Sequence, residues 1–292
     1  MQSSAVFSIL LPLALVVIML GLGLSLTAAD FRKVIARPKP VVVALVCQAL
    51  VLPVICFGIV YASALPPAIA VGMMLLAASP GGSSANLYSH LAGGDVALNI
   101  TLTTINTVLS LVTLPIIVNL SLVAFYGQGK VIPLQLDKVL QVFALVLIPV
   151  TIGMLVRNRK ESLAVALDRP VKILSSLFLA GIVVAALIQE WNTLLVWGPV
   201  IGLATLAFNL ISLAIGYGVP RLLNLDRRQA IAICMEIGIH NSTLVIAIAL
   251  SPTLLNNSEM AIPPALYGLI AYITAAFFVF AIKRRGEVES PA

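Results

Sequence analysis

Hydrophobic runs of membrane-spanning length alternate with short polar segments along almost the whole chain. An α-helix that crosses a bilayer needs about 20 mainly apolar residues. On that criterion the pattern predicts about nine transmembrane helices. They run roughly over residues 6–28, 40–61, 67–92, 96–124, 133–156, 170–189, 196–220, 229–251 and 262–282. No stretch is left for a soluble domain, so the pattern predicts an all-α polytopic membrane protein in which residues 1–292 form one transmembrane unit.

The composition agrees with this pattern, because 61% of the residues are hydrophobic, 10% are charged and the mean hydropathy is +1.12. Such values exclude a soluble domain. All but two of the 17 Lys and Arg residues fall on one predicted side, and only Lys130 and Lys138 lie opposite. The positive-inside rule then predicts a multi-pass protein of the cell inner (plasma) membrane, with the N-terminus outside and the C-terminus cytoplasmic. The net positive charge reflects this topology, so no nucleic-acid partner is predicted.

Two of the predicted helices are interrupted near their middle. In the third, Pro80, Gly81 and Gly82 cannot continue a regular helix, and in the eighth Gly238 stands among polar side chains. Irregular backbone at membrane depth is tolerated only where protein or a water-filled cavity surrounds it. The two breaks are five helices apart, and an odd offset reverses the chain direction. The pattern therefore predicts inverted five-helix repeats with the first helix missing, which is a transporter architecture.

Glu236 is the only acidic residue predicted inside a membrane span. A charged side chain at that depth costs at least a few kcal/mol, so it usually faces an ion, a partner or a water path. Polar side chains elsewhere in the spans have to face protein for the same reason. They are Gln48, Asn99, Thr103, Asn106, Thr107 and Asn209. A membrane-embedded enzyme with Glu236 and His240 one helical turn apart is the alternative, although the second histidine of the H-E-x-x-H arrangement is missing.

Three segments resemble the bile acid:sodium symporter family. They are EIGIHN at 236–241, PGGSSANLYSHLAGGDVALN at 80–99 and RPKPVVVALVCQALVLP at 37–53. The resemblance covers nearly the whole chain and implies two crossed broken helices within a core domain that moves against a panel domain. The core would comprise the spans at roughly 40–124 and 196–282, and the panel those at roughly 6–28 and 133–189.

The resemblance also implies two sodium sites. The first would use Asn86, Asn99, Thr103 and Glu236, and the second Gln48, Glu236, Ile237, Ile239 and His240. The family has serine at positions 85 and 99 and glutamine at 240. Ala85 offers no side-chain oxygen and His240 offers only nitrogen. A proton on His240 would place a second positive charge beside the ion, so we expect protons and sodium to compete there.

The sequence thus predicts a sodium-coupled symporter of a small to medium organic anion, such as a pantoate-like, keto-acid-like or bile-acid-like carboxylate, that works by alternating access. It is not predicted to be an enzyme, and Na⁺ is the coupling ion with no cofactor. The N-termini of the two second half-helices present free amides that attract anions. Candidate substrate residues are Ser83, Ser84, Asn86, Asn241, Ser242, Thr243 and Tyr272. A proton-coupled or arsenite-type carrier of related fold is the alternative within the transporters.

Overall fold

The computed structural model describes residues 38–127, 136–167, 190–252 and 254–288, together with isolated positions between 16 and 24 and between 170 and 188. Within these ranges the regular structure is helical, and the only β-type pairing is one isolated bridge. The predicted all-helical fold is therefore confirmed for the described residues. Most of the predicted spans 6–28 and 170–189 lies outside them.

Each of the other seven predicted spans corresponds to described helices. The elements are α3 (Pro38–Val46), the π-helix η1 (Cys47–Val51), α4 (Leu52–Ala62), α5 (Pro67–Ala78), α6 (Ser83–Leu91), α7 (Val96–Tyr126), α8 (Leu136–Arg159), α10 (Trp191–Leu222), α11 (Arg227–Gly238), α12 (Ser242–Leu250), the 3-10 helix η2 (Glu259–Ala261) and α13 (Ile262–Val288). By length and composition, three described helices can each cross a membrane, or four when the two arms of the bent α7 count as one span. The half-helices α5, α6, α11 and α12 are each too short to cross alone.

Three prolines explain three departures from regular helix. A proline has no N–H and clashes with the carbonyl group four residues earlier. The π-helix η1 lies just before Pro53, and α7 bends by 54° at residue 111, four residues before Pro115. Pro80 lies in the break between α5 and α6. A π-turn, a bend and a break are the usual consequences of proline in a helix.

Capping side chains fix where two central helices begin. The carboxylate of Asp95 accepts a hydrogen bond from the Leu98 N–H at 3.0 Å and starts α7. Asp226 accepts from the Gln229 N–H at 2.8 Å, and the Gln229 side chain bonds back to the N–H of Asp226. Such caps satisfy amide groups that have no partner within the helix. They set the register of the two helices that carry the central polar residues.

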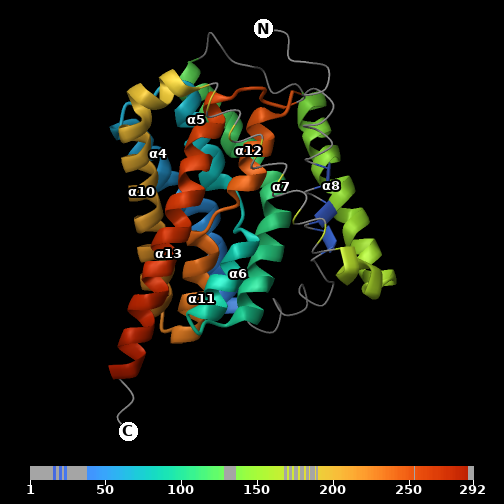
Figure 1. The fold of residues 1–292 in the computed structure, drawn as a ribbon, viewed down its shortest axis with the longest axis vertical. Helices are drawn as coiled ribbons and strands as arrows, with labels where there is room; N and C mark the ends of the chain where they lie inside the picture. The colour runs from blue at the N-terminus through green and yellow to red at the C-terminus, as the bar shows by residue number, and fades with distance from the viewer. Residues whose placement is uncertain are drawn as a thin grey trace.

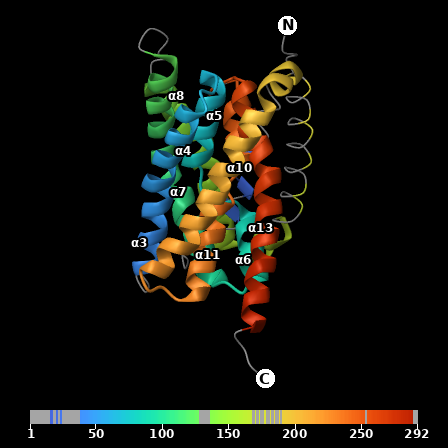
Figure 2. The ribbon, with the colours of Figure 1, turned by 90° about the vertical axis from the view of Figure 1, so that its left-hand side faces the viewer.

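The half-helices form two pairs that run in opposite directions. In Figure 1, α5 and α12 lie in the upper half of the molecule and α6 and α11 in the lower half. The chain therefore descends through α5 and α6 and rises through α11 and α12. The long helices α10 and α13 cover one side, as Figure 2 shows, while α8 lies at the opposite edge beside α7. This arrangement places both breaks at mid-height inside the helix bundle.

Candidate functional site

The two breaks meet at the centre of the bundle. Gly81 and His240 form the isolated antiparallel bridge. Two backbone hydrogen bonds close it, from Gly82 N–H to the Ile239 carbonyl at 2.7 Å and from Asn241 N–H to the Pro80 carbonyl at 2.9 Å. Backbone groups that leave a helix at membrane depth must find partners inside the protein. The crossing supplies them, and it brings segments about 160 residues apart into contact.

Glu236 lies in the last turn of α11, next to this crossing, and is completely buried. Its carboxylate accepts hydrogen bonds from Thr103 Oγ1 at 2.5 Å, Asn106 Nδ2 at 2.9 Å and the Gly81 N–H at 3.3 Å. Within the described part of the chain it forms no ion pair with a basic side chain. An ionised carboxylate without a counter-charge is costly at this depth. The arrangement therefore creates a strong preference for a bound cation or a proton.

Position 81 requires glycine because the Glu236 carboxylate occupies the space that a side chain would need. A Cβ atom at position 81 would overlap the Glu236 carboxylate carbon and both of its oxygens, whereas a Cβ at Gly82 would meet only ordinary contacts at 3.5 Å. Neither residue has a positive φ. From the sequence, both glycines indicated only a helix break. The structure shows in addition that one of them makes room for the acidic side chain.

Polar residues of α7 face protein, as the pattern predicted, and Asn99, Thr103 and Asn106 contact α11. Asn99, Thr103 and Thr107 are all buried, and Asn99 Nδ2 donates to the Ala232 carbonyl at 2.7 Å. The buried amide oxygens without a hydrogen-bond partner include Asn86 Oδ1, Asn99 Oδ1 and Asn106 Oδ1. Buried polar atoms without partners are rare in folded proteins. Oxygen atoms without donors, beside a carboxylate, are the ligands that a hard cation prefers.

Asn106 was not among the site residues expected from the sequence, although it lies on the polar stripe. It follows Thr103 by three residues, so the two side chains share one face of α7. Both donate to the same carboxylate. The i,i+3 spacing was the signal that could have identified it.

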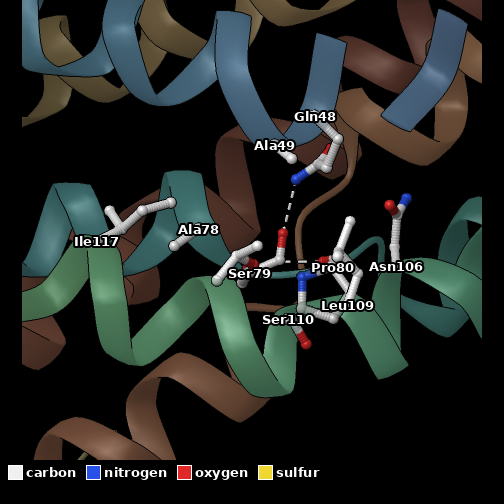
Figure 3. Close-up of a pocket in the computed structure, with 10 residues that line it drawn as sticks. Gln48, Ala49, Ala78, Ser79, Pro80, Asn106, Leu109, Ser110 and Ile117 are labelled. Carbon is white, nitrogen blue, oxygen red and sulfur yellow. Dashed lines mark hydrogen bonds between the residues drawn. The ribbon is translucent and has the colours of Figure 1, made fainter. Parts of the chain in front are cut away.

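The second expected set is only partly assembled. Gln48 Nε2 donates to the Ser79 carbonyl at 2.7 Å (Figure 3) and lies 3.4 Å from His240 Nδ1. The His240 ring stacks on Phe208 and meets Tyr267 edge-on, each at a centroid distance of 5.4 Å. Gln48 and His240 are therefore neighbours, but Gln48 directs its amide nitrogen toward the crossing. The amide oxygen of Gln48 is buried and has no hydrogen-bond partner.

One premise of the enzyme alternative is wrong. Helix α11 ends at Gly238, so Glu236 and His240 do not lie one turn apart on a helical face. The backbone leaves the helix between them because it forms the crossing. Across the described ranges, no three His, Cys, Asp or Glu side chains gather closely enough to hold a metal ion.

The carbonyl oxygen of Gly238, freed where α11 ends, accepts two hydrogen bonds. Asn209 Nδ2 and the Tyr267 hydroxyl each donate to it at 2.9 Å, and they lie 3.0 Å from each other. Thr274 Oγ1 donates to Asn209 Oδ1 at 2.5 Å. The prediction that Asn209 faces protein is confirmed. These side chains hold the end of α11 in place, and sequence reasoning had not assigned them to the site.

The expected substrate residues lie on both sides of the crossing. Ser84 Oγ is 3.0 Å from the Tyr272 hydroxyl, and the Tyr272 ring stacks on Tyr88 at 6.1 Å. Tyr272 is 45% exposed, so this cluster is accessible. Ser83 and Asn86 lie in the first turn of α6, and the side chain of Ser83 is outside the described set.

One expectation for the other half-helix has to be corrected. The Asn241 side chain accepts from the Leu244 N–H at 3.0 Å, so it caps α12 itself. Two amides in the range expected to be free are also bonded, since the N–H groups of Asn241 and Ser242 donate to the Pro80 and His240 carbonyls, each at 2.9 Å. Ser242 and Thr243 begin α12, and Ser242 Oγ is buried without a partner.

Comparison with known proteins assigns the chain to a family. The model of the sodium bile acid symporter family matches residues 12–197. The chain is 29% identical over 234 residues to a Bacillus subtilis protein named as an uncharacterized sodium-dependent transporter, YocS, and covers 71% of its length. It is 29% identical over 285 residues to human sodium/bile acid cotransporter 4 and 26% identical over 238 residues to the probable chloroplastic sodium/metabolite cotransporter BASS1 of Arabidopsis thaliana.

The alignments cover 80% of this chain for the Bacillus protein, 94% for the human protein and 80% for the plant protein. They cover only 63% of the human protein and 57% of the plant protein. The chain therefore spans less than two thirds of those two relatives. The family match itself covers more than half of this chain and includes the α5–α6 break. Together with the apolar helices, it identifies a membrane protein of a transporter class. The chain belongs to the sodium bile acid symporter family.

Proposed function

We propose that this protein is a sodium-coupled symporter in which Glu236 binds the coupling ion. The observation that carries the proposal is a completely buried carboxylate with three hydrogen-bond donors and no basic partner in the described structure. A sodium ion would supply the missing positive charge. Thr103 Oγ1, which contacts Glu236, and the unpartnered oxygen of Asn99 on the same helix are candidates for further ligands, and Asn86 would add one from α6. Several oxygens with one carboxylate suit a hard monovalent cation.

Binding at this position couples several parts of the bundle. Glu236 belongs to α11, Thr103 to α7 and Gly81 to the α5–α6 break. An ion that replaces hydrogen bonds at the carboxylate changes the contacts among all three segments. A ligand shifts a conformational equilibrium only through such differences between states. The site is therefore suited to govern alternating access.

The moving parts in this proposal are the core and panel domains expected from the sequence. Two glycines support the grouping of the panel. A Cβ on Gly23 would overlap the backbone of Val150, and a Cβ on Gly153 would overlap backbone atoms of Leu20, Gly23 and Leu24. Small residues that allow two backbones to touch are typical of tightly packed membrane helices. The contact of these few described residues of the first span with α8 supports placing both in the panel, while α10 and α13 pack on the half-helices of the core. Nine helices in inverted repeats, with the C-terminus in the cytoplasm, complete the proposed topology.

The proposed substrate is a small to medium organic anion. Its carboxylate would lie at the N-terminus of α6, where the helix dipole favours negative charge. Ser84 and Tyr272 offer two hydroxyl groups 3.0 Å apart beside it, in a partly exposed position. A thermal-shift screen of carboxylates in sodium chloride, with neutral and cationic analogues beside them, tests this assignment. Stabilisation by neutral or cationic compounds alone would contradict it.

The central test replaces Glu236 by glutamine, which keeps the volume and removes the charge. We expect Glu236→Gln to abolish both the stabilisation of the purified protein by sodium relative to choline and sodium-driven uptake into proteoliposomes. Glu161→Gln is the matched control, because Glu161 is an exposed residue in a surface ion pair with Arg157. A wild-type sodium response in Glu236→Gln would refute the proposal. Uptake that follows a pH gradient and ignores sodium would favour the proton-coupled alternative.

A further inference from the structure

Helix α13 carries an outward-facing apolar stripe that ends in an arginine. Leu269, Ile273, Phe277 and Phe280 are all exposed and recur at intervals of three or four residues, and the exposed Arg284 continues the series. Residues at such intervals share one face of a helix. The guanidinium of Arg284 lies over the Phe280 ring at 5.5 Å. In a membrane protein this face meets lipid acyl chains, and the arginine marks the level at which the headgroups begin.

Helix α10 lies beside α13 and repeats this pattern (Figure 2). Leu203, Leu210 and Arg221 are exposed and follow one another by seven and then eleven residues. These intervals correspond to about two and about three helical turns, so the three side chains lie on one face. Two neighbouring helices therefore each present an apolar stripe that leads to an arginine.

The two basic ends are joined by hydrogen bonds. Arg227, at the start of α11, donates through Nη2 to the Ile282 carbonyl of α13 at 2.8 Å. Arg221 Nη1 donates to the Leu225 carbonyl, in the short connection between α10 and α11, at 2.9 Å. The bond from Arg227 thus brings that connection against the last turns of α13, although the bonded residues are 55 positions apart. Two basic runs that are remote in sequence become one cluster.

Positive charge is in excess at this end of the bundle. The basic residues with exposed side chains are Arg221, Arg228, Lys283 and Arg284. The acidic residues beside them, Asp95 and Asp226, already accept hydrogen bonds from helix amides as the caps of α7 and α11. In the proposed topology the cluster faces the cytoplasm, and the cytoplasmic leaflet carries anionic lipids. The charge of the cluster therefore complements the surface beside which it lies.

We propose that this basic cluster, at the common end of α10 and α13, binds the phosphate of an anionic phospholipid whose acyl chains follow the two apolar stripes. Guanidinium groups can bind phosphate oxygens through two parallel hydrogen bonds, and ammonium groups add point charge. A lipid held in this way bridges the α10–α11 connection and the end of α13. None of these residues belongs to the proposed ion or substrate sites, so the inference goes beyond sodium coupling.

The first test compares two lipids with identical acyl chains. Delipidated full-length protein in a neutral detergent, with choline chloride as the salt, receives anionic phosphatidylglycerol or zwitterionic phosphatidylcholine. Native mass spectrometry measures the bound lipid, and a thermal-shift assay measures its stabilising effect. We expect phosphatidylglycerol to bind the wild type at least about tenfold more tightly, because several basic side chains act on one net negative charge.

Variants then locate the binding. Arg221→Gln/Arg284→Gln removes one charge from each helix and should lower phosphatidylglycerol affinity at least about tenfold. Lys283→Gln/Arg284→Gln should act similarly, and it leaves the α10–α11 connection intact. Helix α8 supplies the matched control, because in the described structure its basic end belongs to a single helix. Arg159→Gln/Lys160→Gln removes two equally exposed charges there and should change the affinity by less than about threefold.

Three results would overturn the inference. Equal binding of phosphatidylglycerol and phosphatidylcholine would show that the cluster does not read lipid charge. An equal loss in the α8 variant would show a general attraction to the basic side of the protein. Equal stabilisation by water-soluble glycerol 3-phosphate at the same concentration would identify a site for soluble anions. Because no sodium is present, failure of the proposed sodium coupling would leave all of these measurements unchanged.

Discussion

Gly81 in the break between α5 and α6 lies directly against the carboxylate of Glu236 in α11. Its N–H donates to that carboxylate, and the space where a side chain would be is occupied by the carboxylate itself. A residue that interrupts one helix thereby forms part of the binding site at the end of another. A methyl group added at position 81 would therefore displace the charged carboxylate, so substitutions that add a single methyl group at the crossing test the binding site.

The adjacent glycines provide the first prediction. Gly81→Ala should reduce sodium affinity at least about tenfold and destabilise the protein by about 1–3 kcal/mol, because the new methyl group must displace the carboxylate. Gly82→Ala should change sodium affinity little, since its Cβ would find 3.5 Å of room. Sodium titrations followed by thermal shift compare the two variants. Equal losses would show that the break needs glycine for a reason other than space at Glu236.

The second prediction separates two neighbouring threonines of α7. Thr103 Oγ1 donates to Glu236, whereas Thr104 Oγ1 donates only to the Ile100 carbonyl of its own helix at 2.9 Å. Thr103→Val should lower sodium affinity by about ten- to a hundredfold, the range for a hydrogen bond to a charged group. Thr104→Val removes an equally buried hydroxyl and should leave affinity unchanged. Similar sodium curves for the two valine variants would exclude a role for Thr103.

The third prediction concerns the side chains that hold the end of α11. Tyr267→Phe removes one of two donors to the Gly238 carbonyl and should cost about 1 kcal/mol of unfolding free energy. Because Glu236 lies two residues earlier, we also expect a higher sodium concentration for half-maximal uptake with little change in maximal rate. Tyr61→Phe, at a residue that is 76% exposed, is the control. A fall in stability with an unchanged sodium curve would show that Tyr267 has only a structural role.

Most helices could be predicted from the sequence because their cause is local. Apolar runs set the spans, and Pro80 with its two glycines marks one break. The burial of Glu236 also followed from local pattern, since an acid in an apolar run stands out. The bend of α7 and the π-helix η1 were not predicted, although Pro115 and Pro53 were visible signals. Tertiary packing decides how a membrane helix accommodates a proline.

The site was less predictable, because its contacts join residues far apart in the chain. No periodicity relates Gly81 or Asn106 to Glu236, and only the crossing brings them together. The orientation of Gln48 depends on the Ser79 carbonyl, which is free only because α5 ends there. Likewise, the amides of Asn241 and Ser242, which the sequence alone had left open to an anion, are bonded to the Pro80 and His240 carbonyls. In both cases, the helix break gives backbone groups hydrogen-bond partners that the sequence does not reveal.

His240 gives the last prediction. Its described neighbours are the Gln48 amide, the Ser79 carbonyl and the rings of Phe208 and Tyr267, none of which carries a charge. A proton on the ring would add a positive charge close to Gln48 and hence to the second sodium site that the family resemblance implies. At about 4 Å and an effective dielectric constant near 20, two such charges repel by about 4 kcal/mol.

We therefore expect wild-type transport to lose apparent sodium affinity as pH falls, and His240→Gln to bind sodium more tightly with a flatter pH dependence. Glutamine offers an oxygen and cannot be protonated in this range. Sodium activation curves at about pH 6 and about pH 8 for both proteins provide the measurement. His90→Gln is the matched control, because His90 is exposed at the end of α6. If His240→Gln and wild type give superimposable curves at both pH values, protonation of His240 does not compete with sodium, and the ring serves to fill the space between Phe208 and Tyr267.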